Sequence, residues 1–119
     1  MVHFIIPYMK KTPNRDILPA RVQRLLAKLG SDIKLARRKR AITVGMMTER
    51  VGVAKATYLK VEKGDPSVSL GVYVMTLFVL GFHSALASVA DPSRDDTGLV
   101  LDAERLPKRV RVRKDPTPL

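Results

Sequence analysis

The chain has 119 residues, of which 45% are apolar, so one domain with its own core is expected and disorder throughout is excluded. It lacks cysteine and any apolar run near the roughly 20 residues of a membrane span, which excludes thiol chemistry and a transmembrane helix and is compatible with the cytoplasm. The net charge of +11 is unevenly distributed: residues 1–63 carry 15 Lys/Arg against 4 Asp/Glu, whereas residues 64–104 carry 1 against 6, which favours a polyanion as one partner.

The first 17 residues are interpreted as an N-terminal arm, because a short apolar run is followed by two prolines. From Leu18 onward, apolar residues recur at helical steps and predict an amphipathic helix. Gly30 can break this helix and Ser31 or Asp32 can cap a new one, so the pattern leaves open one helix or two. The helix end is basic, which suits the macrodipole and also allows phosphate contacts: Lys34, Arg37, Arg38, Lys39 and Arg40.

Two short helical patterns follow, over 44–51 and 54–63, and Gly52 separates them. Met47 and Val51 are four residues apart and therefore share one face of the first helix, which we expect to point inward. Gly52 can adopt a positive φ without a Cβ clash, so the chain can end one helix there and turn sharply. The spacing predicts two short helices, one of which packs against and supports the other.

The second of these helices has two contrasting faces. Tyr58 and Val61 fall on one side and are expected in the core. The outward side is small, polar and basic, which suits the major groove of B-DNA, where lysine can donate to guanine and a methyl group can touch thymine. We favour this over the alternative, a solvated helix surface, for the outward residues Lys55, Ala56, Thr57 and Lys60.

The rest of the chain predicts two more helices and a tail. Residues 70–80 form a helix that is apolar nearly all round, so a second subunit is expected to bury part of it unless it is an ordinary core helix. A short helix over 84–90 follows. Alternation of valine and arginine over 110–113 predicts a β-strand, for which we favour a role in dimerisation.

Catalytic and metal-binding patterns are poor. His3 and His83 are far apart in the sequence, and neither a phosphate-cradling glycine loop nor a Ser/His/Asp arrangement is present. The acidic stretch from Asp91 to Glu104 lacks the spacing of an EF-hand and is interpreted as a solvated linker. We therefore expect no enzyme activity, no cofactor and no metal site.

Two segments resemble the Cro and lambda-repressor-like (Xre) regulators: GVAKATYLKVEKG is similar to their turn and third helix, and LGSDIKLARRKRAIT to their first helix. More narrowly, EKGDPSVSLGVYVMTLFVLGF, followed by ADPSRDDTGLVLDAERLPKRVR, resembles the antitoxin regulators that are paired with HipA-type kinase toxins. The resemblance implies an all-α fold: a five-helix lambda-repressor-like helix-turn-helix domain over 18–90, after the arm over 1–17. The remaining residues, 91–119, are then an acidic linker and a basic strand used in dimerisation.

The resemblance also implies roles for individual residues. It places a buried structural ion pair on Arg37 and Glu62. Three positions depart from the family: Val44 stands where glutamine is common, Ala54 replaces a capping serine or threonine, and Thr48 replaces alanine. The resemblance, together with the basic end of the first helix, places the DNA contacts on Thr43, Val44, Lys55, Ala56, Thr57, Lys60, Lys63 and Arg38.

The expected function is that of a sequence-specific repressor of transcription that binds double-stranded DNA as a homodimer. We expect it in the cytoplasm, at the nucleoid, as the antitoxin and autoregulator of a type II toxin–antitoxin operon with a HipA-like kinase toxin. The alternative is a protein-interaction module that inhibits such a toxin, with DNA binding secondary, or a regulator that acts without a toxin.

Overall fold

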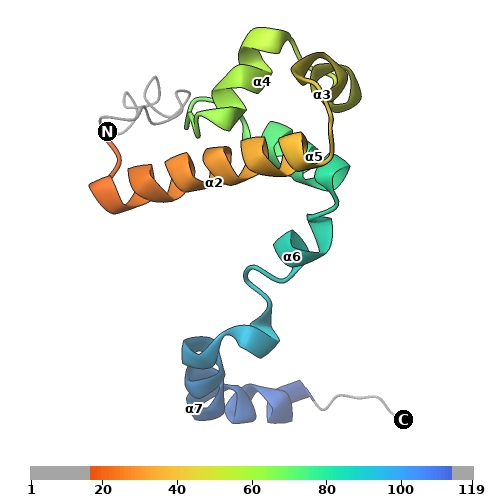
Figure 1. The fold of residues 1–119 in the computed structure, drawn as a ribbon. Coiled ribbons are helices and arrows are strands. Elements are labelled where there is room, and N and C mark those ends of the chain that lie inside the picture. Colours follow the sequence, from red (N-terminus) through yellow and green to blue (C-terminus); the bar gives the residue numbers. More distant parts are fainter. Residues whose placement is uncertain (1–16, 114–119) are drawn as a thin grey trace, which may run out of the picture. The chain divides into compact units, whose positions relative to one another are not determined.

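The chain folds into helices. A computed structural model describes residues 17–113, with side chains up to residue 105, and this part contains six α-helices, one 3-10 helix and no strand (Figure 1). The all-α class predicted from the sequence is confirmed for these residues. The predicted N-terminal arm lies outside them, apart from Ile17. The structure divides into two compact units between His83 and Ser84.

The first unit is a small helical body around one core. Its long helix α2 packs on α4 and α5, and α3 also packs on α4 and α5. In Figure 1, α3 and α4 lie on the same side of α2. The bounds are α2 Ala20–Lys39, α3 Val44–Val51, α4 Lys55–Glu62 and α5 Leu70–Leu80. The buried core is formed by Ile33, Ala36, Met47, Tyr58, Val61, Val68, Tyr73 and Leu80.

Helix α2 is continuous, which decides between the two alternatives that the sequence left open. It runs through Gly30 without a break, and Gly30 is buried. A Cβ atom at this position would lie 2.5 Å from the backbone nitrogen of Gly64 and 2.6 Å from the carbonyl oxygen of Glu62. Gly30 is therefore a site of close helix packing and not a helix end.

The turns follow local side-chain chemistry. Gly52 has φ 82° and ends α3 in the left-handed region, as a residue without Cβ can do at no steric cost. Ser69 caps α5 by accepting a hydrogen bond from the Val72 N–H at 3.3 Å. Ala54, which cannot cap, precedes α4 without a side-chain hydrogen bond. Between α4 and α5, the Tyr73 hydroxyl donates to the carbonyl oxygen of Asp65 at 2.7 Å, which holds the connecting turn against α5.

The second unit contains most of α6 (His83–Ala87), the 3-10 helix η1 (Pro92–Arg94) and α7 (Asp96–Arg113). Asp95 caps α7 by accepting a hydrogen bond from the Gly98 N–H at 2.9 Å. The strand predicted over 110–113 is wrong, because α7 continues through these residues. A lone strand needs a partner for its backbone groups, whereas a continuing helix pairs them within the segment.

None of the helices in the described range combines the length and apolar character that crossing a membrane requires.

Candidate nucleic-acid interface

Helix α4 buries one face and exposes the other. Tyr58 and Val61 are fully buried, each at 0% exposure. On the opposite side Lys55, Ala56 and Lys60 are exposed and Thr57 is half-buried. Leu59, which the sequence interpretation did not include, adds an apolar side chain that is 37% exposed. The outward face thus combines two cations with small side chains on a short helix, the size and chemistry that a major groove admits.

A buried ion pair fixes α4 to α2. Arg37 donates from Nε to Glu62 Oε2 at 2.6 Å and from Nη2 to Glu62 Oε1 at 3.3 Å. The side chains of Arg37 and Glu62 are only 10% and 6% exposed. Arg37 also donates from Nη1 to the carbonyl oxygen of Ile42 at 2.9 Å, in the turn before α3. One guanidinium therefore joins α2, the end of α4 and the turn that leads into α3.

Tyr58 completes this buried network from within α4. Its hydroxyl donates to Glu62 Oε2, the same oxygen that accepts from Arg37. Burial raises the pKa of the Tyr58 hydroxyl well above its ordinary value, and the hydrogen bond to Glu62 raises it further. The hydrogen bond to Glu62 likewise raises the pKa of Arg37. The network thus keeps Tyr58 neutral and Arg37 charged, and its role is structural.

The N-terminus of α3 offers backbone donors. Thr43 caps it: the side-chain oxygen accepts from the Met46 N–H at 3.1 Å, and the carbonyl oxygen accepts from the Met47 N–H at 3.0 Å. The N–H groups of Val44 and Gly45 precede these bonds at the open end of the helix, where an anion is favoured. Val44 itself is half-buried against the core, so its contribution here comes from the backbone.

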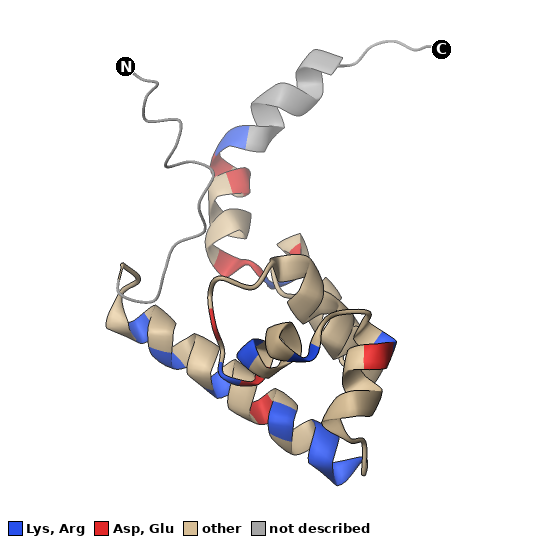
Figure 2. Ribbon diagram, turned by 90° about the horizontal axis from the view of Figure 1, so that it is seen from above, with Lys and Arg blue, Asp and Glu red and all other residues tan. Residues whose placement is uncertain are grey.

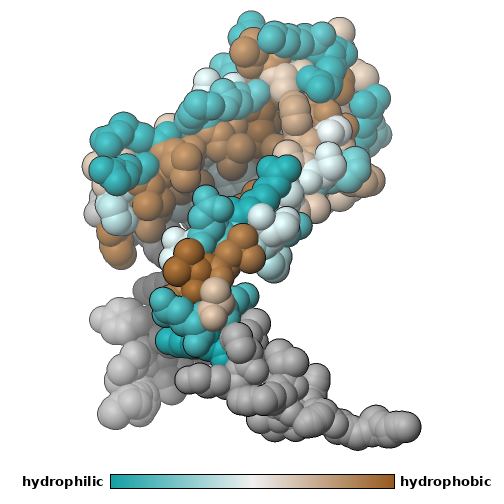
Figure 3. Space-filling view, turned by 90° about the horizontal axis from the view of Figure 1, so that it is seen from below, coloured by the Kyte–Doolittle hydropathy of each residue, from teal (hydrophilic) through white to brown (hydrophobic). Residues whose placement is uncertain are grey.

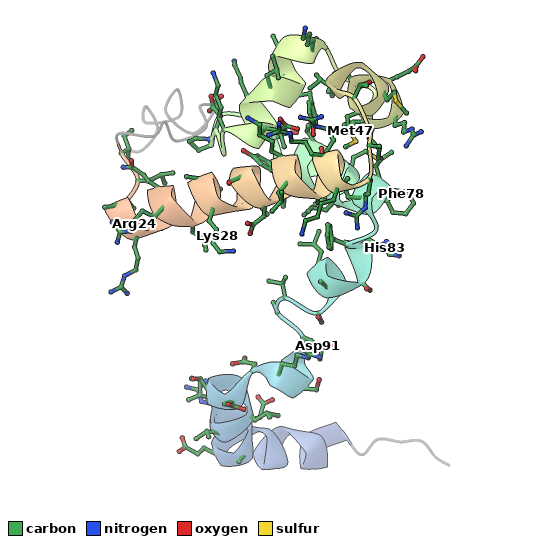
Figure 4. The ribbon with its side chains drawn as sticks, viewed as in Figure 1. Arg24, Lys28, Met47, Phe78, His83 and Asp91 are labelled. Carbon is green, nitrogen blue, oxygen red and sulfur yellow. The ribbon has the colours of Figure 1, made fainter. Side chains whose placement is uncertain are left out.

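Further cations lie on α2 and at the end of α4. Arg38 is exposed in the last turn of α2, and Lys63 is exposed directly after α4. Figure 2 shows Lys and Arg in blue along α2. Lys63 lines a surface pocket of about 350 Å³ together with Gln23 and Arg24 of α2. Arg24 and Lys28 project from α2 in Figure 4.

Seven of the predicted contacts thus lie on α3, on α4 or next to their ends, whereas Arg38 lies in the last turn of α2. The structure also adds residues that the sequence interpretation missed. Arg24 was missed because its proximity to Lys63 depends on how α2 crosses α4. Tyr58 was expected only as a core residue, although its spacing of four from Glu62 allowed a contact within one helix. No group of three or more His, Cys, Asp or Glu residues in the described part could hold a metal ion.

Comparison with protein-family models and with curated proteins finds no match for this chain.

Proposed function

We propose that this protein is a sequence-specific repressor of transcription that binds double-stranded DNA through a lambda-repressor-like helix-turn-helix formed by α3 and α4. One observation carries the proposal: α4 exposes Lys55, Ala56 and Lys60 on the face opposite the buried Tyr58 and Val61. This face combines two cations with small side chains, the chemistry that a major groove admits.

In this mechanism α4 enters the major groove. The ammonium groups of Lys55 and Lys60 donate to acceptors on base edges, guanine O6 and N7 being the best suited. Ala56 and the methyl group of Thr57 touch thymine methyl groups. The rigid packing of α4, held by the ion pair between Arg37 and Glu62, sets the depth at which these side chains meet the bases.

Phosphate contacts orient the domain on the duplex. The open N-terminus of α3 at Thr43 and Val44 binds one phosphate through backbone N–H groups and the Thr43 hydroxyl, whose hydrogen is not used in the cap. Arg38 and Lys63 add charge contacts to neighbouring phosphates. Such contacts raise affinity for all sequences, whereas the α4 side chains supply the discrimination.

A homodimer gives the repressor two recognition helices that bind half-sites about one helical turn apart. The resemblance to antitoxin regulators supports a cytoplasmic, nucleoid-associated protein that represses its own toxin–antitoxin operon. A sequence-specific dimer needs no cofactor or catalytic group for this activity.

A second candidate function is that of an interaction module that inhibits a HipA-like kinase toxin. An apolar groove of about 540 Å³ on α5 favours a protein ligand: it is lined by Leu70, Gly71, Val74, Met75, Phe78 and His83. The rings of Phe78 and His83, which both line this groove, lie 5.2 Å apart (Figure 4). Figure 3 shows that apolar side chains are also exposed on one face of the first unit.

The proposal is tested by measuring the affinity of the purified protein for DNA from its own upstream region and for a scrambled duplex over a series of salt concentrations. A repressor binds its operator at least ~10³-fold more tightly than the scrambled duplex. Equal affinity for both, with a steep salt dependence, would mean that the basic face is only electrostatic, and the interaction module would then be favoured.

A further inference from the structure

The second unit has helices, but its described side chains, up to residue 105, form no buried core. None of the residues from 84 to 105 is buried. On α7, Leu99, Val100 and Leu101 are 48%, 60% and 45% exposed, and within this unit α7 packs against η1. Pro107 in the second half of α7 cannot donate a helical hydrogen bond. A helix of this kind gains its stability by packing an apolar face against a partner.

The sequence of α7 carries the spacing of a helix-pair seam. Leu99, Ala103, Leu106 and Val110 follow one another at steps of four, three and four residues, the heptad spacing of a coiled coil. These positions are symmetric about the midpoint between Glu104 and Arg105. A twofold axis at that midpoint places the position of Leu99 opposite that of Val110, and the small Ala103 opposite the large Leu106.

Charge is divided along the same helix. Residues 91–104 contain five acidic residues and one arginine, whereas residues 105–114 contain six basic residues and no acidic one. The division falls at the symmetry point of the apolar seam. A parallel pair of such helices would set acid beside acid and base beside base, which is unfavourable. An antiparallel pair sets the acidic half of each helix beside the basic half of the other.

We propose that α7 forms an antiparallel pair with α7 of a second copy of this chain, with the twofold axis between Glu104 and Arg105. In this register Asp96 lies opposite Arg113 of the partner subunit, and Asp102 lies near Arg109 of the partner subunit. The contact is isologous, since the same surface serves both copies. The inference rests on the homodimer of the proposed function and identifies the surface that forms it.

Charge reversal tests the pairing in the full-length chain. One variant combines Asp96→Lys, Asp102→Lys and Glu104→Lys, and the other combines Arg105→Glu, Arg109→Glu and Arg113→Glu. For each variant alone, the dimer dissociation constant obtained from light-scattering measurements of mass is expected to be at least tenfold higher than that of the wild type. An equimolar mixture is expected to recover the dimer mass, which also shows that both variants are competent to pair.

Lys34→Glu, at an exposed position of α2, is the control for a change of charge outside α7 and is expected to keep the wild-type mass. Dimers of wild-type stability in both charge-reversed variants would overturn the inference, and so would a failure of their mixture to recover the dimer.

The absence of cysteine from the natural chain allows the direction of the pair to be tested separately. The two copies of position 99 are about 16 Å apart along an antiparallel pair, since a helix rises 1.5 Å per residue, which is beyond the reach of a disulfide. A mixture of Leu99→Cys and Val110→Cys chains is therefore expected to form mixed disulfides. Self-linkage of Leu99→Cys with no mixed product would show a parallel pair and overturn the inference.

These outcomes are distinguishable from failure of the proposed function. The mass and cross-linking measurements contain no DNA, whereas the repressor is judged by operator selectivity. Operator-selective dimers that are unaffected by the α7 variants would remove this inference and retain the repressor.

Discussion

Gly30 of α2 and Gly64 of the turn after α4 touch through their backbones, so that a Cβ atom on Gly30 would lie 2.5 Å from the backbone nitrogen of Gly64. Gly64 has φ 71°, in the left-handed region that glycine adopts without strain. The crossing of α2 and α4 thus depends on two residues that have no side chain. The orientation of the outward face of α4 follows from this contact.

Gly30→Ala is expected to destabilise the protein by about 1–3 kcal/mol, because the added methyl group meets backbone atoms that cannot move aside. Gly71→Ala is the matched control: in α5 an added Cβ would meet only Ser69 Oγ at 3.9 Å. That substitution is expected to stabilise by about 0.4–1 kcal/mol through the unfolded chain. Urea unfolding measures both. Equal effects of the two substitutions would contradict the close crossing.

Arg37→Ala is expected to lower the free energy of unfolding by about 3–5 kcal/mol, because Glu62 would keep a buried charge without its partner. Lys28→Ala is the control. Lys28 pairs with Asp32 at the same distance of 2.6 Å, but these side chains are 73% and 57% exposed. Its loss is expected to change stability by less than about 1 kcal/mol. Similar losses in the two variants would show that burial does not distinguish the pairs.

Tyr58 predicts a dependence of stability on alkaline pH. Its pKa is raised in the folded protein above the ordinary value of 10.0, so the native state keeps a proton that the unfolded chain releases. This contribution to stability is fully present below pH 10 and is lost as the pH rises through the folded pKa. The stability of the wild type is therefore expected to fall more steeply above pH 10 than that of Tyr58→Phe. Parallel curves for the two proteins would exclude this linkage.

The helices of the first unit could be predicted from the sequence because their signals are local. The apolar spacing gave α3 and α5 with the bounds that the structure has, since a capping residue before each helix and a glycine after it mark the ends. The role of Gly30 could not be predicted in this way. A glycine inside a helical pattern has the same local signature whether it ends the helix or admits another backbone, and only the packing of α2 on α4 decides between them.

The strand predicted over 110–113 was wrong because the local pattern there is too short to decide between a strand and a helix. Two repeats of valine and arginine fit a strand locally, but such a short pattern also fits a continuing helix. The capping of α7 by Asp95, far upstream of the repeats, starts the helix that includes them. At the candidate interface, residue type and spacing were enough to propose the outward face of α4. They did not show Arg24 beside Lys63, because that proximity arises from tertiary packing.

Arg38→Ala is expected to weaken binding to operator and to random duplexes by the same factor and to reduce the salt slope by about 1, as the loss of one phosphate contact requires. Arg94→Ala removes an equal charge from η1. It is expected to leave the affinities for both kinds of duplex and the salt slope unchanged. Fluorescence anisotropy over a salt series measures the slopes. A loss restricted to the operator would assign Arg38 to base contacts and contradict its proposed role.

The claim that the outward face of α4 discriminates between bases is tested most directly by selecting binding sites from random duplexes with the wild type and with Lys60→Ala. We predict that the wild type enriches a twofold-symmetric site with half-sites about one helical turn apart. Lys60→Ala is predicted to lose preference at one base position in each half-site, with a loss of about 1–3 kcal/mol on the selected sequence. The same base preference in both proteins, or no enriched sequence with either, would contradict the account.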